Sequence, residues 1–182
     1  MHKGIVLYQS KYGSSEKYAR QLAHTINYEL RNLKETKIED LLDNADHKYQ
    51  TIILCGGIYA SGVAGLQFIR KHMVNLNNKR LAVLAVGASP YNKTALEQLK
   101  ARHFHGALEK IPLFYGRGSW KMEEMTIVDR TLCRLLIRHL SKKERSAYEP
   151  WEEALMSSVG HSTDWVDFRY LDPIIEYLQG CH

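Results

Sequence analysis

The segment Ser10-Lys11-Tyr12-Gly13-Ser14-Ser15 has the residue types of an anion-binding loop. It follows the apolar run Gly4–Tyr8 and precedes a helical pattern that begins near Glu16. The first backbone N–H groups of a helix have no partner within it and carry a partial positive charge, so they attract an anion. Gly13 permits a positive φ, and the serines add O–H donors. The segment predicts a phosphate site, although the same turn would suit an N-capped junction that binds nothing.

Two more loops contain residues suited to a flat ligand. Residues 56–62 (Gly-Gly-Ile-Tyr-Ala-Ser-Gly) and 87–92 (Gly-Ala-Ser-Pro-Tyr-Asn) each follow an apolar run. Their glycines would let the backbone approach a ring, and Tyr59 and Tyr91 are candidates for ring contacts. The alternative is that the glycines only form turns and the tyrosines pack within the loops.

The elements that would position these loops alternate along the chain. We expect strands at Ile5–Tyr8, Thr51–Cys55, Leu81–Val86 and Ile111–Tyr115, with a weak further strand near Lys37-Ile38. Helical patterns lie between them: one stripe contains Tyr18, Leu22, Ile26 and Leu30, a second runs from Val63 to Leu76, and a third from Ala95 to Phe104. Continuous apolar strands separated by helices predict βαβ units and a parallel sheet covered on both faces. Ligands of such sheets bind beyond the carboxyl ends of the strands, where all three loops lie.

The rest of the chain departs from this alternation. We expect a helix from about Met125 to Leu140, with Val128, Leu132, Leu135 and Leu136 on its apolar face. Arg130, Arg134 and Arg138 repeat on another face, which is either solvated or meets an anionic surface such as lipid headgroups, a carboxylated porphyrin or an acidic protein. Residues 146–162 are expected to form a surface loop. Asp172-Pro173 predicts the start of a last helix.

Composition and charge exclude several classes of protein. The 182 residues are 45% apolar and 25% charged, as in a globular protein, and we expect one domain over residues 1–182. No apolar run is long enough to span a bilayer, and the N-terminus has no signal-peptide pattern. Cys55, Cys133 and Cys181 are widely spaced, which predicts reduced thiols in a cytoplasm. Residues 117–145 carry eight Lys or Arg and four Asp or Glu, whereas residues 146–182 carry one and seven.

The sequence lacks the motifs of metal, dinucleotide, P-loop, serine-hydrolase and nucleic-acid sites. The nine histidines are scattered without a carboxylate or cysteine cluster, so we expect no metal. Gly116-Arg117-Gly118 lacks the rest of a dinucleotide fingerprint, and neither a P-loop nor a Gly-x-Ser-x-Gly pattern is present. No nucleic-acid motif is present, so we expect no nucleic-acid partner.

In order, the three loops resemble those of the flavodoxin-like family, in particular the group that includes the menaquinone-dependent protoporphyrinogen dehydrogenases. Phe114-Tyr-Gly-Arg117 and Thr163-Asp-Trp165 support that group, and the resemblance covers nearly the whole chain. It implies a three-layer α/β fold with a five-stranded parallel sheet of order 2-1-3-4-5. It also implies FMN, with its phosphate in the first loop and its ring between the other two. The implied cofactor-binding residues are Ser10, Lys11, Tyr12, Gly13, Ser14, Ser15, Gly57, Ile58, Tyr59, Ala60, Ser61, Gly62, Gly87, Ala88, Ser89, Tyr91 and Asn92.

We therefore predict a cytoplasmic FMN-binding oxidoreductase or electron-transfer protein, with the dehydrogenase activity as one form of it and no catalytic acid or base assigned. Its expected partners are a redox protein, a quinone or a small electron acceptor, and a membrane surface met by residues 117–145. Two alternatives stay open: a non-catalytic electron carrier and a cofactor-free interaction domain. The carriers of this family are acidic, whereas this chain has a net charge of +5.

Overall fold

The computed structural model describes residues 4–42, 49–59, 62–157, 159–160 and 163–180. Its main sheet has five parallel strands in the order β2 (Glu29–Asn32), β1 (Gly4–Gln9), β3 (Thr51–Tyr59), β5 (Arg80–Gly87) and β6 (Leu113–Arg117). A sixth, short strand, β4 (Gly62–Val63), pairs antiparallel with the end of β3. Counted among the parallel strands alone, this is the predicted order 2-1-3-4-5, and the three-layer α/β fold is confirmed.

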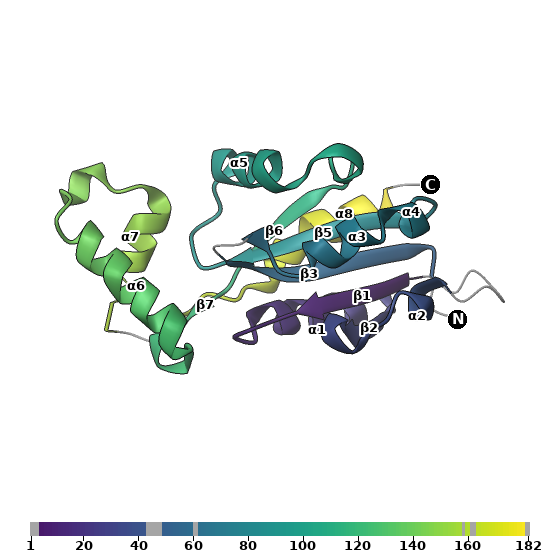
Figure 1. Ribbon diagram of the computed structural model, residues 1–182, viewed down its shortest axis with the longest axis horizontal. Helices are drawn as coiled ribbons and strands as arrows, with labels where there is room; N and C mark the ends of the chain where they lie inside the picture. Colours follow the sequence, from purple (N-terminus) through teal and green to yellow (C-terminus); the bar gives the residue numbers. More distant parts are fainter. Residues whose placement is uncertain (1–3, 43–48, 60–61, 158, 161–162, 181–182) are drawn as a thin grey trace.

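Helices cover both faces of the sheet (Figure 1). One face packs against α1 (Ser14–Ile26) and α8 (Asp172–Gln179), and the other against α3 (Leu66–Lys71), α4 (Met73–Leu76) and α5 (Lys93–His103). The short helix α2 (Glu39–Leu42) follows β2. Apolar residues alternate between the two cores because successive side chains of a strand point to opposite faces: Ile52 and Leu54 lie in one core, Ile53 and Cys55 in the other.

Three sequence-based boundaries are wrong, each for a local reason. Asn27 takes a left-handed conformation (φ 54°) and ends α1, so Leu30 lies in β2 and not on the predicted helical stripe. The second strand is therefore Glu29–Asn32, not Lys37-Ile38; it is a half-buried edge strand without an apolar run. Val63 belongs to β4, and α3 begins only after Gly65.

Residues 122–157, which we call the arm, leave the body beyond the carboxyl ends of the strands (Figure 1). The arm contains η3 (Met122–Glu124), α6 (Ile127–Leu140), η4 (Arg145–Ala147) and α7 (Pro150–Ser157). The predicted helix near 125–140 is confirmed as α6, whereas the loop expected over residues 146–162 contains α7. The antiparallel pair β7 (Ser119–Trp120) and β8 (Thr163–Asp164) joins the arm to the body.

The chain returns to the body through η5 (Phe168–Leu171) and α8, which begins at the predicted Asp172-Pro173. The side chain of Tyr18 on α1 fixes this return, since its hydroxyl donates to the carbonyl of Arg117 (2.7 Å) and accepts from the N–H of Asp167 (3.1 Å). Burial raises the pKa of Tyr18 to about 12. In the described part of the chain, no helix has the length and apolar character needed to cross a bilayer.

Candidate functional site

A cavity of about 470 Å³ opens where the ends of β1, β3 and β5 face the arm. Its lining residues are Ser10, Tyr12, Ser14, Ser15, Gly57, Ile58, Tyr59, Val86, Gly87, Ala88, Gly118, Ser119, Trp120, Met125, Asp129, Leu132, Cys133 and Leu136. All three predicted loops contribute to this list. The polar side of the cavity is the start of α1, and the apolar side is formed largely by α6.

The first loop has the geometry of an anion site. Gly13 precedes α1 with φ at 86°, a conformation that L residues with a side chain rarely adopt. Its N–H donates to Ser10 Oγ (2.9 Å), and the first helical bond runs from the N–H of Lys17 to the carbonyl of Gly13 (3.0 Å). No described residue accepts from the N–H groups of Ser14 and Ser15, which stand at the positive end of α1.

The hydroxyl of Ser14 is used mainly to join two elements. Its Oγ accepts from the N–H of Ser119 (3.0 Å) and lies 2.6 Å from Ser119 Oγ. Both Ser14 and Ser15 are buried. Ser14 therefore attaches β7 to the start of α1, and the backbone N–H groups remain as the main anion donors of this loop.

The second loop brings Tyr59 to the edge of the cavity. Tyr59 Oη accepts from the N–H of Lys11 (3.1 Å), and the rings of Tyr12 and Tyr59 meet edge to face with centroids 6.3 Å apart. Burial raises the pKa of Tyr59, so its phenol is neutral at ordinary pH. A Cβ on Gly57 would lie 2.6 Å from Tyr59 Oη, so glycine is needed for this side chain to fold back.

The third loop contributes only its first residues to the cavity. Gly87 and Ala88 line it, whereas Asn92 caps α5 by accepting from the N–H of Ala95 (3.0 Å). Tyr91 is 53% exposed and packs against Tyr115, with ring centroids 6.1 Å apart. The loop is therefore fixed by its own contacts and by β6.

The arm supplies a wall that sequence reasoning did not assign to the site. Met125, Leu132, Cys133 and Leu136 present apolar atoms to the cavity, and Asp129 presents a carboxylate. Asp129 contacts both Lys11 Nζ and Tyr12 Oη. Hydrogen bonds from these two groups lower the pKa of Asp129 below its ordinary value of 3.8. The contact holds α6 against the first loop. Of the apolar face predicted for this helix, Leu132 and Leu136 line the cavity, whereas Val128 and Leu135 are more than half exposed and lie outside its lining.

One polar atom in the lining of the cavity, from β7, lacks a partner among the described residues. Trp120 Nε1 is buried and has no hydrogen-bond acceptor among the described residues. A buried N–H group without an acceptor is costly, and such groups often mark the place of a ligand. Trp120 lines the cavity, so an acceptor on a bound molecule would satisfy it.

The predicted cofactor residues fall into three groups. Nine line the cavity: Ser10, Tyr12, Ser14, Ser15, Gly57, Ile58, Tyr59, Gly87 and Ala88. Lys11, Gly13, Gly62, Ser89, Tyr91 and Asn92 are not among its lining residues. Ala60 and Ser61 lie outside the described residues, as does Cys181. Cys55 is buried in the sheet, which raises its thiol pKa, and Cys133 lines the cavity from α6.

A family model described as "Flavodoxin domain" matches residues 5–147. No curated protein matches the sequence. Among solved structures, the Trp repressor binding protein from Bacillus subtilis is similar at 19% identity, with 64% of this chain and 85% of that chain covered and a TM-score of 0.45. The WrbA-like flavodoxin from Agrobacterium tumefaciens is similar at 16% identity, with 81% and 100% covered and a TM-score of 0.44. The two-electron reduced flavodoxin from Megasphaera elsdenii is similar at 13% identity, with 61% and 81% covered and a TM-score of 0.43.

The match to the family confirms FMN as the predicted cofactor, and the cavity residues fit it. FMN has a dianionic phosphate at one end and a flat, largely apolar ring at the other. The start of α1 offers unpaired N–H groups to the phosphate, and the far side of the cavity offers apolar side chains to the ring. The indole N–H of Trp120 is available to a polar atom of the cofactor.

Proposed function

This chain belongs to the flavodoxin domain family, and from that premise we propose that it is an FMN-dependent oxidoreductase with a substrate chamber of its own, of the protoporphyrinogen dehydrogenase type. The observation that carries the proposal is the apolar wall that α6 adds to the cavity between the cofactor loops. FMN supplies the electron transfer, and the protein must bind, orient and shield the reactants.

The arm is suited to a flat, apolar substrate. Leu132 and Leu136 lie one turn apart on α6 and face the loops across the cavity. Such a wall excludes water from the ring and offers contact area to a second ring system. A carboxylated porphyrinogen has this combination of a broad apolar body and acidic groups, and the basic arm complements its charge.

The contacts of Asp129 hold this wall in place. The carboxylate joins α6 to Lys11 and Tyr12 of the first loop, so the wall and the phosphate site are connected. Thr126 caps the start of α6, because its side chain accepts from the N–H of Asp129 (3.3 Å). These contacts position the chamber; none of them assigns a catalytic acid or base.

The competing function is that of an electron carrier, which passes electrons through an exposed flavin edge. The α6 wall argues against it, because the wall stands over the loops that would present that edge. The test is to reduce the FMN-loaded protein and compare electron transfer to a quinone with transfer to a protein acceptor, and to measure oxidation of protoporphyrinogen. Turnover of porphyrinogen with quinone supports the proposal; transfer to the protein acceptor alone contradicts it.

A matched set of variants tests the wall itself. Leu132→Gln and Leu136→Gln place polar atoms in the chamber, whereas Leu135→Gln changes an exposed neighbour outside the cavity lining. We expect the first two to lower kcat/KM for porphyrinogen, measured per bound FMN, about tenfold or more, which corresponds to about 1.4 kcal/mol of lost transition-state binding. Equal activity in all three variants would contradict the role of the wall.

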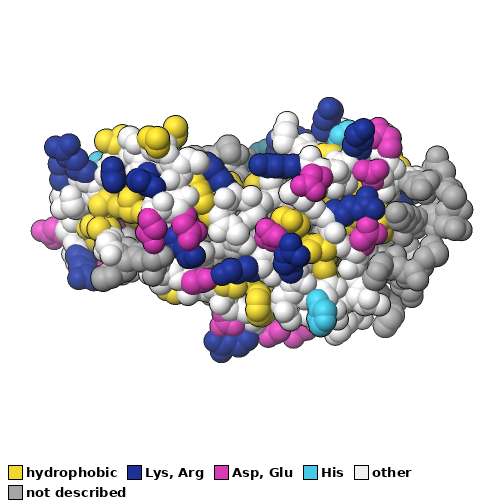
Figure 2. All heavy atoms as spheres, turned by 90° about the horizontal axis from the view of Figure 1, so that it is seen from below, with side chains coloured by type: hydrophobic (Ala, Val, Ile, Leu, Met, Phe, Trp, Pro, Cys, Tyr) yellow, Lys and Arg dark blue, Asp and Glu magenta, His cyan; other side chains and the backbone are white. Residues whose placement is uncertain are grey.

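We also propose that the arm meets an anionic membrane surface, which would supply apolar reactants such as quinones. Outside the cavity lining, Ile127, Val128 and Leu135 are 59–83% exposed, and Arg134 and Arg138 are exposed on the same helix. Figure 2 shows hydrophobic and basic side chains gathered at the end of the molecule formed by the arm. Arg130 is different, because its guanidinium donates to the carbonyls of Met122 (3.0 Å), Glu123 (2.7 Å) and Met125 (3.1 Å) and so fixes η3.

Vesicle binding tests this surface. Arg134→Gln/Arg138→Gln should lower sedimentation with vesicles that contain anionic lipid, since each basic residue near such a surface contributes about 1 kcal/mol. Lys93→Gln/Lys100→Gln on α5 removes the same charge away from the arm and should leave binding unchanged. Binding that both pairs weaken equally would contradict a specific surface on the arm.

A further inference from the structure

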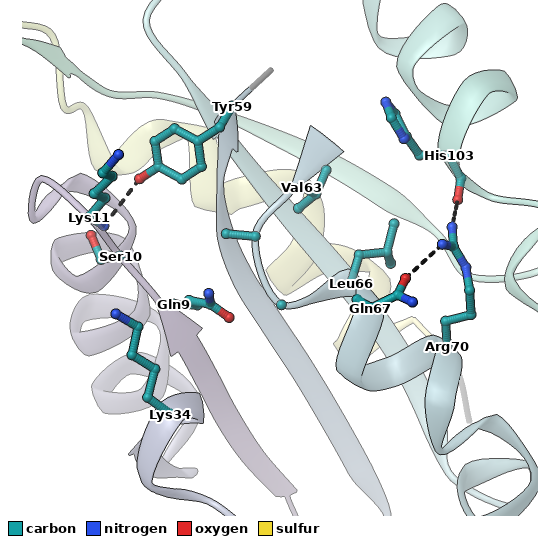
Figure 3. Close-up of a pocket in the computed structure, with 12 residues that line it drawn as sticks. Gln9, Ser10, Lys11, Lys34, Tyr59, Val63, Leu66, Gln67, Arg70 and His103 are labelled. Carbon is teal, nitrogen blue, oxygen red and sulfur yellow. Dashed lines mark hydrogen bonds between the residues drawn. The ribbon is translucent and has the colours of Figure 1, made fainter. Parts of the chain in front are cut away.

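A second cavity, of about 540 Å³, shares Tyr59 with the first and is drawn in Figure 3. One wall comes from the end of β1, the first loop and η1 (Leu33–Glu35), and includes Lys11 and Lys34. The opposite wall comes from α3 and the end of α5, and includes Arg70 and His103. Figure 3 shows the side chains of the two walls facing a common space.

The charge of this cavity is not balanced from within. Its described lining includes Lys11, Lys34, Arg70 and His103 but no Asp or Glu. Lys11 is paired with Asp129, whereas no described carboxylate lies within ion-pair distance of Lys34 or Arg70. Like charges around one hollow repel each other, and a bound anion would relieve this.

Arg70 is held in position by neutral acceptors. Its guanidinium donates to Gln67 Oε1 (2.8 Å) and to the carbonyl of His103 (2.8 Å), as Figure 3 shows. These bonds fix the side chain between α3 and α5 and leave its full charge uncompensated. Arginine has five donor N–H groups, so further donors remain for a ligand.

The second cavity is separate from the FMN cavity. They share only Tyr59 and Ser10 among their lining residues, and the N–H of Lys11 donates to Tyr59 Oη at this shared edge. The start of α1, which offers N–H groups to the FMN phosphate, does not line the second cavity. A ligand here would therefore bind beside FMN and not in its place.

We propose that this cavity binds a small organic anion with acidic groups at two ends, one held by Lys34 and the other by Arg70. Its volume lies within the range of small-molecule sites, and its cationic groups come from opposite walls. Phosphate and carboxylate groups share the required charge and acceptor geometry, so the ligand is either a phosphorylated or a carboxylated compound. The proposal does not depend on the substrate of the FMN site.

Calorimetry on the FMN-loaded full chain at low ionic strength tests the proposal, with pyrophosphate and succinate as separate probes. We expect at least one probe to bind without displacing FMN and to bind more weakly as salt is added. Binding of pyrophosphate alone would identify phosphorylated ligands, and binding of succinate alone would identify carboxylated ones. Failure of both probes to bind, or release of FMN by the probe, would overturn the proposal.

A charge-matched pair of variants locates the binding. Lys34→Gln/Arg70→Gln should weaken the probe at least tenfold, because both ends lose their cation. Lys71→Gln/Arg102→Gln removes the same charge from exposed positions on α3 and α5 outside the cavity lining, and should change the affinity less than twofold. Equal weakening by the two pairs would show non-specific attraction and overturn the proposal. Arg70→Lys keeps the charge without the two hydrogen bonds, so an intermediate affinity of this variant supports binding at Arg70. Full affinity in Lys34→Gln/Arg70→Gln would overturn the proposal.

Discussion

The body and the arm differ in how far their apolar residues are buried. In the body, β1, β3 and β5 bury nearly all of their apolar side chains between two helical layers. In the arm, Leu140 is the one residue of α6 that is fully buried, and four large apolar side chains of the same helix are more than half exposed. Both regions are rich in hydrophobic residues, so composition alone does not distinguish them.

This difference indicates two separate roles for hydrophobic residues. The body uses them to stabilise itself, because each buried Leu or Ile contributes about 1.5–3 kcal/mol. The arm holds together with a smaller set of contacts: Leu140 and Leu155 are buried, Tyr148 Oη donates to the carbonyl of Leu140 (3.0 Å), and Lys143 pairs with Glu152 (2.8 Å). Its remaining apolar atoms face the cavity or solvent, where a ligand or a surface can cover them.

Removing one leucine from each region tests the difference between body and arm most directly. Leu54→Ala in β3 leaves a cavity in the packed core, so we expect it to lower the free energy of unfolding by about 2–5 kcal/mol. Leu135→Ala in α6 removes an exposed side chain and should change that free energy by less than about 0.5 kcal/mol. Urea denaturation of both variants measures the difference. Comparable losses would show that the arm has a core of its own and would refute the comparison.

A substitution in the first loop should have the next largest effect, a loss of FMN affinity. Gly13→Val puts a β-branched residue at φ 86°, which costs about 1–3 kcal/mol and turns the N–H groups of the loop. We expect FMN affinity to fall more than tenfold in a fluorescence titration. Gly106→Val is the matched control, because Gly106 also has a positive φ (61°) and open space around it but lies far along the chain in η2. Loss of FMN in both variants would assign the effect to general destabilisation.

The body could be predicted from the sequence because its signals are local. Runs such as Thr51–Cys55 and Leu81–Val86 are continuous and apolar, which is typical of parallel strands covered on both faces. The edge strand β2 (Glu29–Asn32) has no such run, and the sequence pattern therefore predicted the strand at Lys37-Ile38 instead. Residues 146–162 lacked a strong helical pattern, and α7 was not expected there.

The cavity could be predicted only in part. The rule that ligands bind at the carboxyl ends of parallel strands located the three loops, and residues of each loop line the cavity. The residues that the arm adds to the cavity depend on how α6 packs against the first loop, which lies more than a hundred residues earlier in the chain. The contact of Asp129 with Lys11 is an example. No local pattern contains that information, so the α6 wall needed the structure.

Removing the contact between arm and body should have a smaller effect, on the rate of FMN dissociation. Asp129→Asn removes the ionic contact with Lys11, and we expect FMN to dissociate a few-fold faster because exposed ion pairs are weak. The pKa of Asp129 is lowered in the folded protein, so the contact is complete above the ordinary value of 3.8 and is lost as the pH falls through the lowered value. The rate difference between variant and wild type should therefore shrink in acid.

Glu153→Gln is the control for that experiment. Glu153 also has a pKa lowered by an ion pair, with Arg145 at 2.7 Å, but both residues lie within the arm and outside the cavity lining. Its FMN release should match the wild type at every pH. Equal acceleration by both variants, measured by the fluorescence of released FMN, would mean that Asp129 has no special part in joining the two regions.

The smallest expected effect comes from Trp120, at the junction of body and arm. Trp120→Phe removes the buried N–H that has no described partner, so the FMN-free protein should lose little stability or gain some, because an unsatisfied donor costs about 1–3 kcal/mol. If that N–H donates to FMN, the same variant binds FMN several-fold more weakly. Urea denaturation without FMN should thus show little change or a gain in stability, while titration with FMN shows weaker binding. A variant that is less stable and binds FMN as tightly as the wild type would show that Trp120 serves packing between the regions and not the cofactor.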